Sequence, residues 1–256
     1  MSRSERSPRE RTVTTGPSVS PTDPQALEFL AEADLRPLGL MPRASNYTFL
    51  VELTHGDHTG LGVYKPRDGE APLWDFPDGT LCNREVAAYV LARALGWPRV
   101  PPTILREGPH GTGSVQLFVE PSTGDHFFTL RERCLEEFLP VAAFDLIANN
   151  ADRKSGHCLL ASDGAIWVVD HGVCFGEEPK LRTVIWDFVG DPIPGGLLSD
   201  VERVSGELRS GPLRDELLRL LTEDEVGAAA RRADSLVRAR RFPHPGPERA
   251  YPWPPV

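Results

Sequence analysis

The amino-acid sequence predicts an α+β fold of two lobes, a small β-rich N-terminal lobe followed by a mostly helical C-terminal lobe. Segments rich in β-branched and aromatic residues, typical of strands, are concentrated in the first half of the chain. Segments with the apolar spacing of amphipathic helices dominate the second half. We therefore divide the 256 residues into a disordered arm (1–24), an N-lobe (25–122), a C-lobe (123–242) and a Pro-rich tail (243–256).

The N-lobe sequence predicts a short amphipathic helix, a hairpin of two strands, a longer helix and one further strand. The turn sequence HGDHTG joins the two hairpin strands, and Pro66 ends the second of them. Gly96 stops the longer helix. The expected segments are, in chain order, 24–38, 46–53, 61–66, 83–96 and 113–120.

The C-lobe sequence predicts a helix, a short hairpin and three further helices. The loop NNADRKSGH connects the first helix to the hairpin, and the turn SDG joins the two hairpin strands. Thr222 and Glu225 have the spacing of a capping box at the start of the last helix. The expected segments are helix 131–149, strands 158–161 and 166–170, and helices 197–210, 213–221 and 222–241.

Charge and composition exclude several classes of protein. The formal net charge is −9, which argues against broad binding to nucleic acid because phosphate contacts need clustered cations. No apolar run approaches the roughly 18 residues of a membrane-spanning helix, and the N-terminal sequence lacks the apolar segment of a secretory signal. The four Cys residues form no CxxC pair. We therefore expect a cytoplasmic, reducing environment and no integral membrane association.

Lysine is scarce in this chain. Only three of its 28 basic residues are Lys, at positions 65, 154 and 180, and the others are Arg. A compact ammonium group and a planar guanidinium group are not interchangeable at a tight site. The retention of Lys65 and Lys154 therefore indicates positions at which Arg does not serve.

Two aspartates flank the predicted C-lobe hairpin. Asp152 precedes its first strand and Asp170 ends its second strand, so both carboxylates can reach one cleft. Paired carboxylates suit a general base and a metal ligand. Either Asp taken alone is more commonly a loop residue that caps a turn. The pair gains weight from Lys65, late in an N-lobe strand, and from Glu85, early in the next helix, because a Lys held by a helix Glu grips nucleotide phosphates.

The segments NNADRKSGH and VVDHG resemble the DRHxxN and D-x-G motifs of the phosphatidylinositol 3/4-kinase-like and HipA-like branch of the protein-kinase-like superfamily. The strand Lys, helix Glu, hinge strand, catalytic loop and D-x-G also follow in the order of such a fold. The chain is most similar to actinobacterial proteins of the phosphatidylinositol 3/4-kinase-like group, and its preference for Arg agrees with such a source. The resemblance covers about residues 40–190 and implies a two-lobed protein-kinase-like fold.

The resemblance implies a role for each matching residue. Asp152 matches the catalytic-loop Asp that orients or deprotonates the acceptor hydroxyl, and Asp170 matches the metal-binding Asp. Lys65 matches the Lys that contacts the phosphates, with Glu85 as its partner. The remaining matches are in the hinge that faces adenine, namely Gln116, Phe118 and Glu120, and in the phosphate-covering loop, namely Ser45 and Asn46.

The catalytic loop departs from the family pattern at two positions. Lys154 stands where the pattern has His, and it can neutralise charge on the transferring phosphoryl group or be an ordinary solvated loop residue. His157 stands where the pattern has a metal-binding Asn. Imidazole suits Mn²⁺ or Zn²⁺ better than Mg²⁺, so His157 either alters the metal preference, only forms hydrogen bonds, or impairs transfer. Asn149 or Asn150 could supply an oxygen ligand instead.

The resemblance implies an ATP-dependent phosphotransferase that uses Mg²⁺ or Mn²⁺ and transfers the γ-phosphoryl group to a hydroxyl of a protein, a lipid head group or a metabolite. Two alternatives stay open, a pseudokinase that binds nucleotide or a partner without transfer, and a non-catalytic interaction protein. A zinc site is a third alternative because four N and S ligands lie within a short stretch, but their spacing disfavours it. These are His157, Cys158, His171 and Cys174.

Overall fold

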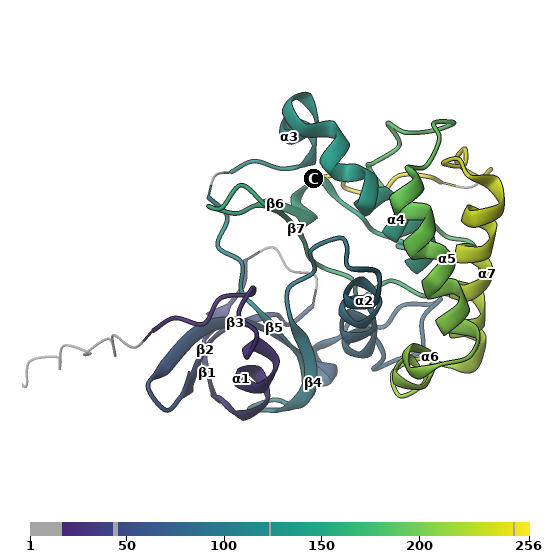
Figure 1. The fold of residues 1–256 in the computed structure, drawn as a ribbon. Helices are drawn as coiled ribbons and strands as arrows, with labels where there is room; N and C mark the ends of the chain where they lie inside the picture. The colour runs from purple at the N-terminus through teal and green to yellow at the C-terminus, as the bar shows by residue number, and fades with distance from the viewer. Residues whose placement is uncertain (1–16, 43–45, 123, 248) are drawn as a thin grey trace, which may run out of the picture.

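A five-stranded antiparallel sheet forms the N-lobe, with the strand order β1-β2-β3-β5-β4. A computed structural model describes residues 17–42, 46–122, 124–247 and 249–256 of the chain. Figure 1 shows this sheet with α1 on one side, α2 between the sheet and the C-lobe, and the remaining helices beyond. The N-lobe elements are α1 (Ala26–Glu32), β1 (Asp34–Leu40), β2 (Phe49–His55), β3 (His58–Pro66), α2 (Leu81–Leu95), β4 (Thr103–Gly108) and β5 (Gly111–Leu117).

The C-lobe consists of helices and one small two-stranded sheet, β6-β7. The predicted α+β fold with a β-rich first lobe and a mostly helical second lobe is therefore confirmed (Figure 1). No helix in the described part of the chain has both the length and the apolar character needed to cross a membrane. The C-lobe elements are α3 (Phe127–Cys134), α4 (Leu139–Ala148), β6 (Cys158–Leu160), β7 (Ile166–Val168), α5 (Gly195–Arg209), α6 (Pro212–Leu217) and α7 (Glu223–Ala239).

The two faces of the N-lobe sheet have different roles. Alternate side chains of a strand point to opposite faces, and one face packs against α1 through a closed apolar core that includes Val51, Tyr64 and Leu117. Lys65 lies opposite Ser114 in the β3–β5 register, and Gln116 lies opposite the residue two positions before Lys65. Lys65 and Gln116 therefore share the other face of the sheet.

Helix α2 connects the two lobes through its packing. Its apolar side chains belong to the same buried core as those of α4, α5 and α7. Glu70 stabilises its first turn because the Glu70 carboxylate accepts hydrogen bonds from the backbone N–H groups of Leu81 at 2.9 Å and Cys82 at 2.7 Å. Gly96 ends the helix with a φ of 83°, as the sequence predicts. The C-lobe core therefore fixes the helix that carries Glu85.

Three N-terminal predictions need correction. The helix expected over 24–38 ends at Glu32, and Asp34–Leu40 instead pairs with β2 as an edge strand, where Pro37 and Gly39 are tolerated at a register shift. The sequence pattern does not predict strand β4. Residues 17–24 are not part of a disordered arm, because the Val19 N–H donates to the Thr59 carbonyl at 2.8 Å. Residues 1–16 of the predicted arm lie outside the described residues.

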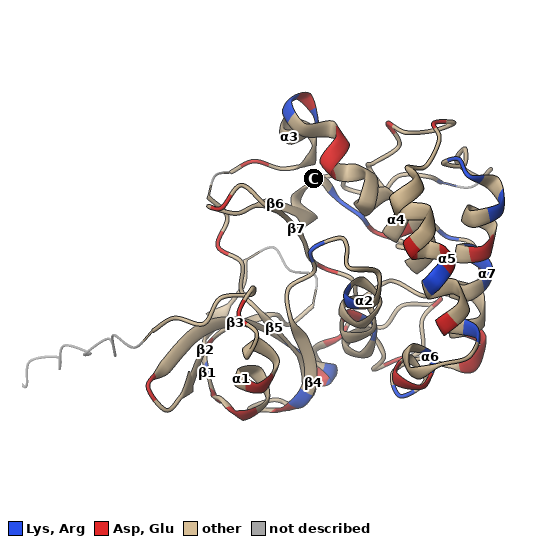
Figure 2. Ribbon diagram, viewed as in Figure 1, with Lys and Arg blue, Asp and Glu red and all other residues tan. Residues whose placement is uncertain are grey.

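The predicted C-lobe elements are present, with one division. The helix expected over 131–149 is split into α3, a 3₁₀ turn and α4, and Pro140 lies in the first turn of α4, where its missing N–H costs nothing. The capping box of α7 is confirmed, since Thr222 Oγ1 accepts from the Glu225 N–H at 3.3 Å and Glu225 accepts from the Thr222 N–H at 2.9 Å. Acidic residues lie in the first turn of α7 and a basic residue lies in its last turn (Figure 2). Both interact favourably with the helix dipole.

Candidate active site

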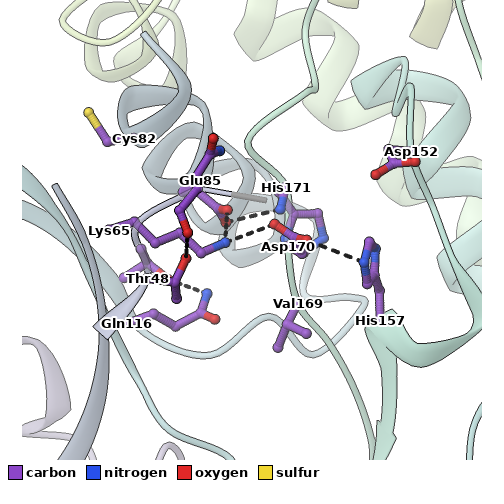
Figure 3. A network of polar contacts seen from close by, with 12 residues as sticks. Thr48, Lys65, Cys82, Glu85, Gln116, Asp152, His157, Val169, Asp170 and His171 are labelled. Atoms are coloured by element: carbon purple, nitrogen blue, oxygen red, sulfur yellow. Dashed lines mark hydrogen bonds and ion pairs between the residues drawn. The ribbon is translucent and has the colours of Figure 1, made fainter. Parts of the chain in front are cut away.

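Three residues from three separate segments form an ion-pair network between the lobes (Figure 3). Lys65 on β3 extends its Nζ toward both the Glu85 carboxylate on α2 and Asp170 Oδ1 after β7, the latter at 2.8 Å. Glu85 is buried, and its second oxygen accepts the backbone N–H of His171 at 3.0 Å. The sequence-predicted pair of Lys65 and Glu85 is therefore present, and Asp170 joins it.

Asp170 occupies a constrained position at the centre of this network. Its backbone φ is 62°, an uncommon conformation for a residue other than Gly, which Asp tolerates better than most. Its carboxylate contacts Lys65 on one oxygen and His157 Nε2 on the other at 3.2 Å. The nearby Lys65 charge holds the pKa of Asp170 well below its usual range, despite the opposing effect of desolvation. Half of this side chain, 51%, stays exposed, so an ionised carboxylate faces the space between the lobes.

The Lys65 ammonium group is held in its charged form. Desolvation alone lowers the pKa of Lys65, but Asp170 and Glu85 outweigh it and raise the pKa above the ordinary value. Its side chain is 21% exposed. A permanent positive charge that reaches the surface between the lobes can bind an anionic group such as a phosphate.

His157 is neutral in this environment. Burial lowers the pKa of His157 to about 4, although Asp170 acts in the opposite direction. The backbone N–H of Lys154 donates to His157 Nδ1 at 3.4 Å, so the ring proton of the neutral imidazole resides on Nε2. Nε2 then donates to Asp170 Oδ2. The residue in the place of the expected metal-binding Asn thus acts as a hydrogen-bond donor to Asp170.

Asp152 lies on the same side of Asp170 as His157, away from Lys65 (Figure 3). Its carboxylate pairs with Lys154 Nζ at 2.9 Å and stays 32% exposed. Burial raises the pKa of Asp152, and Lys154 partly offsets this rise. The two aspartates therefore occupy one site but differ in basicity, because Lys65 favours the ionised form of Asp170 strongly and Lys154 favours that of Asp152 only in part.

A buried ion pair supports the loop that carries Asp152. Arg153 and Asp145 are both fully buried, and the guanidinium group donates to the Asp145 carboxylate at 2.9–3.3 Å. Arg153 also donates to the Val169 carbonyl at 3.0 Å and contacts His171 Nε2 at 2.8 Å. Arg153 thereby links the loop before β6 to the segment after β7. Sequence reasoning missed this set, although a lone carboxylate in the apolar stretch VAAFDLIA was its signal.

The two asparagines of this loop serve the structure. Asn149 donates to the carbonyls of Gly176 and Glu178 and accepts the Lys180 N–H. Asn150 donates to Asp145 and accepts the Asp152 N–H at 3.0 Å. Because both side chains are buried and already bonded, neither supplies the oxygen ligand that the sequence left open.

The predicted nucleotide-contacting residues lie at the edge of the same site. Gln116 is buried beside the Lys65 network and donates to Thr103 at 2.8 Å (Figure 3). Phe118 and Glu120 follow β5 in the connection between the lobes, and Glu120 is exposed. Asn46 Oδ1 accepts the Ala71 N–H at 2.8 Å, so this side chain orders the loop after β3. Ser45 lies outside the described residues.

The zinc alternative has no structural support in the described ranges, in which no group of three or more potential ligands converges on a metal position. Cys158 and Cys174 are fully buried, and burial raises the pKa of Cys158 to about 12. Burial also lowers the pKa of His171 well below its ordinary value while its Nε2 faces Arg153. These residues therefore behave as core and loop-supporting groups.

The two lobes, with a strand Lys paired to a helix Glu between them, define a kinase-like fold. The chain is 41% identical over 262 residues to Protein Rv2133c of Mycobacterium tuberculosis, an alignment that covers 88% of this chain and 93% of that protein. The chain belongs to the family of Protein Rv2133c. No protein-family model matches it.

More distant similarities point to proteins named as kinases. The chain is 32% identical over 144 residues to phosphatidylinositol 4-kinase gamma 4 of Oryza sativa and 24% identical over 202 residues to phosphatidylinositol 4-kinase gamma 3 of Arabidopsis thaliana. These alignments cover 49% and 59% of this chain but only 26% and 35% of the plant proteins. Among solved structures, the Helicobacter pylori proinflammatory kinase CtkA aligns over 83% of this chain and 94% of its own, with a TM-score of 0.46 and 13% identity.

Proposed function

We propose that this protein is an ATP-dependent phosphotransferase of the phosphatidylinositol 3/4-kinase-like type, which binds ATP with Mg²⁺ or Mn²⁺ between its lobes. The observation that carries the proposal is the position of Lys65, whose ammonium group contacts Glu85 and Asp170 at once. Kinase sites use this combination because the helix Glu orients the Lys toward the phosphates while the Asp faces the metal. In this proposal Gln116, Phe118 and Glu120 line the adenine end.

The ligands available at this site fit a metal ion that is coordinated mainly by phosphate oxygens. Mg²⁺ is commonly held by one or two carboxylates together with phosphate oxygens and water, and Asp170 offers one ionised, half-exposed carboxylate. When bound, the ion neutralises charge that develops on the transferring phosphoryl group. His157 orients Asp170 through its Nε2 proton, and the neutral imidazole adds no positive charge that would repel a cation.

Asp152 serves as the base in this proposal. Its pKa, raised by burial, lies closer to the working pH than that of an ordinary carboxyl group, which makes the ionised form a better proton acceptor. Lys154 favours the ionised form of Asp152 and presents a second positive charge beside the base. The hydroxyl acceptor belongs to a protein, a lipid head group or a metabolite, and the names of the plant relatives make a phosphatidylinositol head group one of these candidates.

A second candidate function is nucleotide binding without transfer. The observation that favours it is the hydrogen bond from His157 to Asp170, because this donor occupies the carboxylate oxygen that a metal ion would otherwise use. Under this alternative, Lys65 and Glu85 still bind phosphates, but the metal ion is bound weakly. Both candidates predict that ATP binds, and they differ in turnover.

A binding and transfer experiment separates these candidates. Thermal unfolding with ATP and either Mg²⁺ or Mn²⁺ measures binding, and formation of ADP from ATP measures turnover. Lys65→Met should abolish both signals. The matched control is Lys180→Met, which removes a Lys that pairs with Asp75 outside the network and should leave both signals in place. Asp152→Asn should bind ATP normally and lose turnover. ATP binding without turnover in the unmodified protein, unaffected by Asp152→Asn, would establish the non-catalytic alternative.

A further inference from the structure

The C-terminal segment 249–256 lies against the loop that carries the proposed base. The Pro255 carbonyl accepts a hydrogen bond from the Ser155 N–H at 2.9 Å, and Ser155 is three residues after Asp152. The Ala250 carbonyl accepts from the Thr183 N–H at 3.1 Å and from the Trp186 indole N–H at 3.0 Å. We call Ser155, Thr183 and Trp186 the tail contact surface. Figure 1 shows the marked end of the chain far from the end of α7, on the α3 side of the C-lobe.

The tail contact surface includes an extended backbone edge, residues 182–184, that the tail covers. Residues 182–184 pair with Arg153 through Arg153 N–H to the Arg182 carbonyl at 2.9 Å and Val184 N–H to the Arg153 carbonyl at 3.1 Å. The Thr183 N–H points the opposite way, toward Ala250. The tail therefore adds to this edge beside the catalytic loop. Main-chain pairing at such an edge is a general mode by which proteins bind extended peptides.

The side chains of the tail contribute little to this contact. Trp253 is 77% exposed and Tyr251 is 52% exposed, so the tail does not dock through its aromatic rings, whereas Pro252 is buried. Residues 242–256 contain no Ser or Thr. The surface thus holds an extended backbone and one proline ring, and its present occupant offers no aliphatic hydroxyl.

Ser155 supplies an independent observation. Its side chain is fully buried, and its Oγ has no hydrogen-bond partner. Buried polar groups are almost always satisfied, and an exception requires an explanation. An orphan hydroxyl directly beside the contact with Pro255 is explained if a different occupant of this surface satisfies it.

We propose that the tail contact surface is the acceptor site and that it binds an extended polypeptide bearing a Ser or Thr hydroxyl. Residues 249–256, which have no such hydroxyl, fill this site in the structure. This inference rests on the proposed phosphotransferase function. The acceptor chain pairs with the Thr183 and Ser155 N–H groups, and its hydroxyl oxygen forms a bond to the γ-phosphorus of ATP. The bond from that phosphorus to the β,γ-bridging oxygen breaks, ADP leaves, and the hydroxyl proton passes to Asp152.

The test uses the full chain with one substitution in the tail. Pro252→Glu places a charge at a buried position and should eject the tail, whereas Pro245→Glu makes the same change at an exposed position and should not. The probe is a fluorescent peptide of the tail's own sequence, RAYPWPPV. A tethered segment competes at an effective concentration on the order of 1 mM, so Pro252→Glu should bind the peptide at least about tenfold more tightly than the unmodified protein or Pro245→Glu. Equal peptide affinity in all three proteins would overturn the inference.

A second variant weakens the contact from the other side. Trp186→Phe removes the indole donor to Ala250, a contact that the peptide also makes, so adding it to Pro252→Glu should weaken peptide binding. Thermal unfolding of each variant verifies that it is folded. No loss of peptide affinity on adding Trp186→Phe, with the variants folded, would contradict the assignment of this surface.

Transfer of phosphate then distinguishes the inference from the function on which it rests. Pro252→Glu should transfer labelled phosphate to a mixed Ser/Thr peptide library at least about tenfold faster than Pro245→Glu, with unchanged ATP binding. If the peptide binds as expected but no protein turns over ATP, the phosphotransferase function fails and the peptide-binding surface stands. Turnover at equal rates in all proteins, or transfer to phosphatidylinositol vesicles and not to peptides, would refute the polypeptide acceptor.

Discussion

The substitution Glu225→Gln tests how the C-lobe fixes the helix that carries Glu85. Arg84 is adjacent to Glu85 on α2, is 1% exposed, and pairs with the Glu225 carboxylate on α7. Arg84 also donates to the Cys174 carbonyl at 2.7 Å and lies 4.7 Å from the centre of the Phe76 ring. Its charge is therefore fully desolvated and has one anionic partner within contact distance among the residues described.

The expected loss in the free energy of unfolding follows from this geometry. Removing one partner of a buried ion pair costs about 3–5 kcal/mol, because it leaves a buried charge without compensation. Gln at position 225 has one acceptor oxygen where Glu225 has two, so it can accept from Arg84 or from the Thr222 N–H but not from both, and we expect a loss of at least about 3 kcal/mol. At roughly 2–4 °C per kcal/mol for a chain of this size, the melting temperature should fall by about 6–12 °C.

Urea denaturation and calorimetry measure this loss, and two controls isolate its cause. Thr222→Ala removes the cap but keeps the ion pair, and it should lower the free energy of unfolding by about 1 kcal/mol. Glu216→Gln breaks the exposed pair with Arg93 and should cost at most about 1 kcal/mol. If Glu225→Gln costs no more than Thr222→Ala, then the Arg84 charge is not held in the way that we describe.

Three further outcomes follow from the site. Asp145→Asn leaves the fully buried Arg153 without its counter-charge, so the free energy of unfolding should fall by about 3–5 kcal/mol, and a loss below about 1 kcal/mol in urea denaturation would contradict the contact. Lys154 favours the ionised form of Asp152, so Lys154→Met should raise the pKa of Asp152 and move the acid limb of the turnover profile to higher pH, whereas an unmoved limb would argue against Asp152 as the base. His157→Asn restores an amide oxygen and should increase turnover with Mg²⁺ relative to Mn²⁺, and an unchanged ratio would show that this residue does not affect the metal.

The parts of the site that the sequence predicts are those with a fixed place in a linear order. Lys65 near the end of a strand, Glu85 early in the next helix and Asp170 after a hairpin could each be placed because strand and helix patterns set their positions. The order of these elements brings the three side chains together. Composition added support through the scarcity of Lys, and both Lys65 and Lys154 do lie in ion pairs of the site.

The parts that the sequence did not predict depend on contacts between distant segments. Arg153 follows Asp152 directly, and the residues next to it in the sequence do not indicate that it is buried against Asp145. Residues 34–38 of β1 also fit the apolar spacing of the helix predicted over 24–38, and only their pairing with β2 decides the outcome. The carbonyl groups of Ala250 and Pro255 make the contacts of the tail, and backbone contacts leave no trace in side-chain identity.

The structure narrows the alternatives that the sequence leaves open for His157. In sequence it is a departure from a metal-binding Asn, which left metal preference, hydrogen bonding and loss of transfer as alternatives. In the structure its Nδ1 accepts the Lys154 N–H, its Nε2 faces Asp170, and burial lowers its pKa to about 4. A neutral donor can hold Asp170 without competing for the ligands that phosphates and water supply. The departure is therefore compatible with catalysis, because each Asp170 oxygen accepts from one donor and keeps a further lone pair that could help to hold a metal ion.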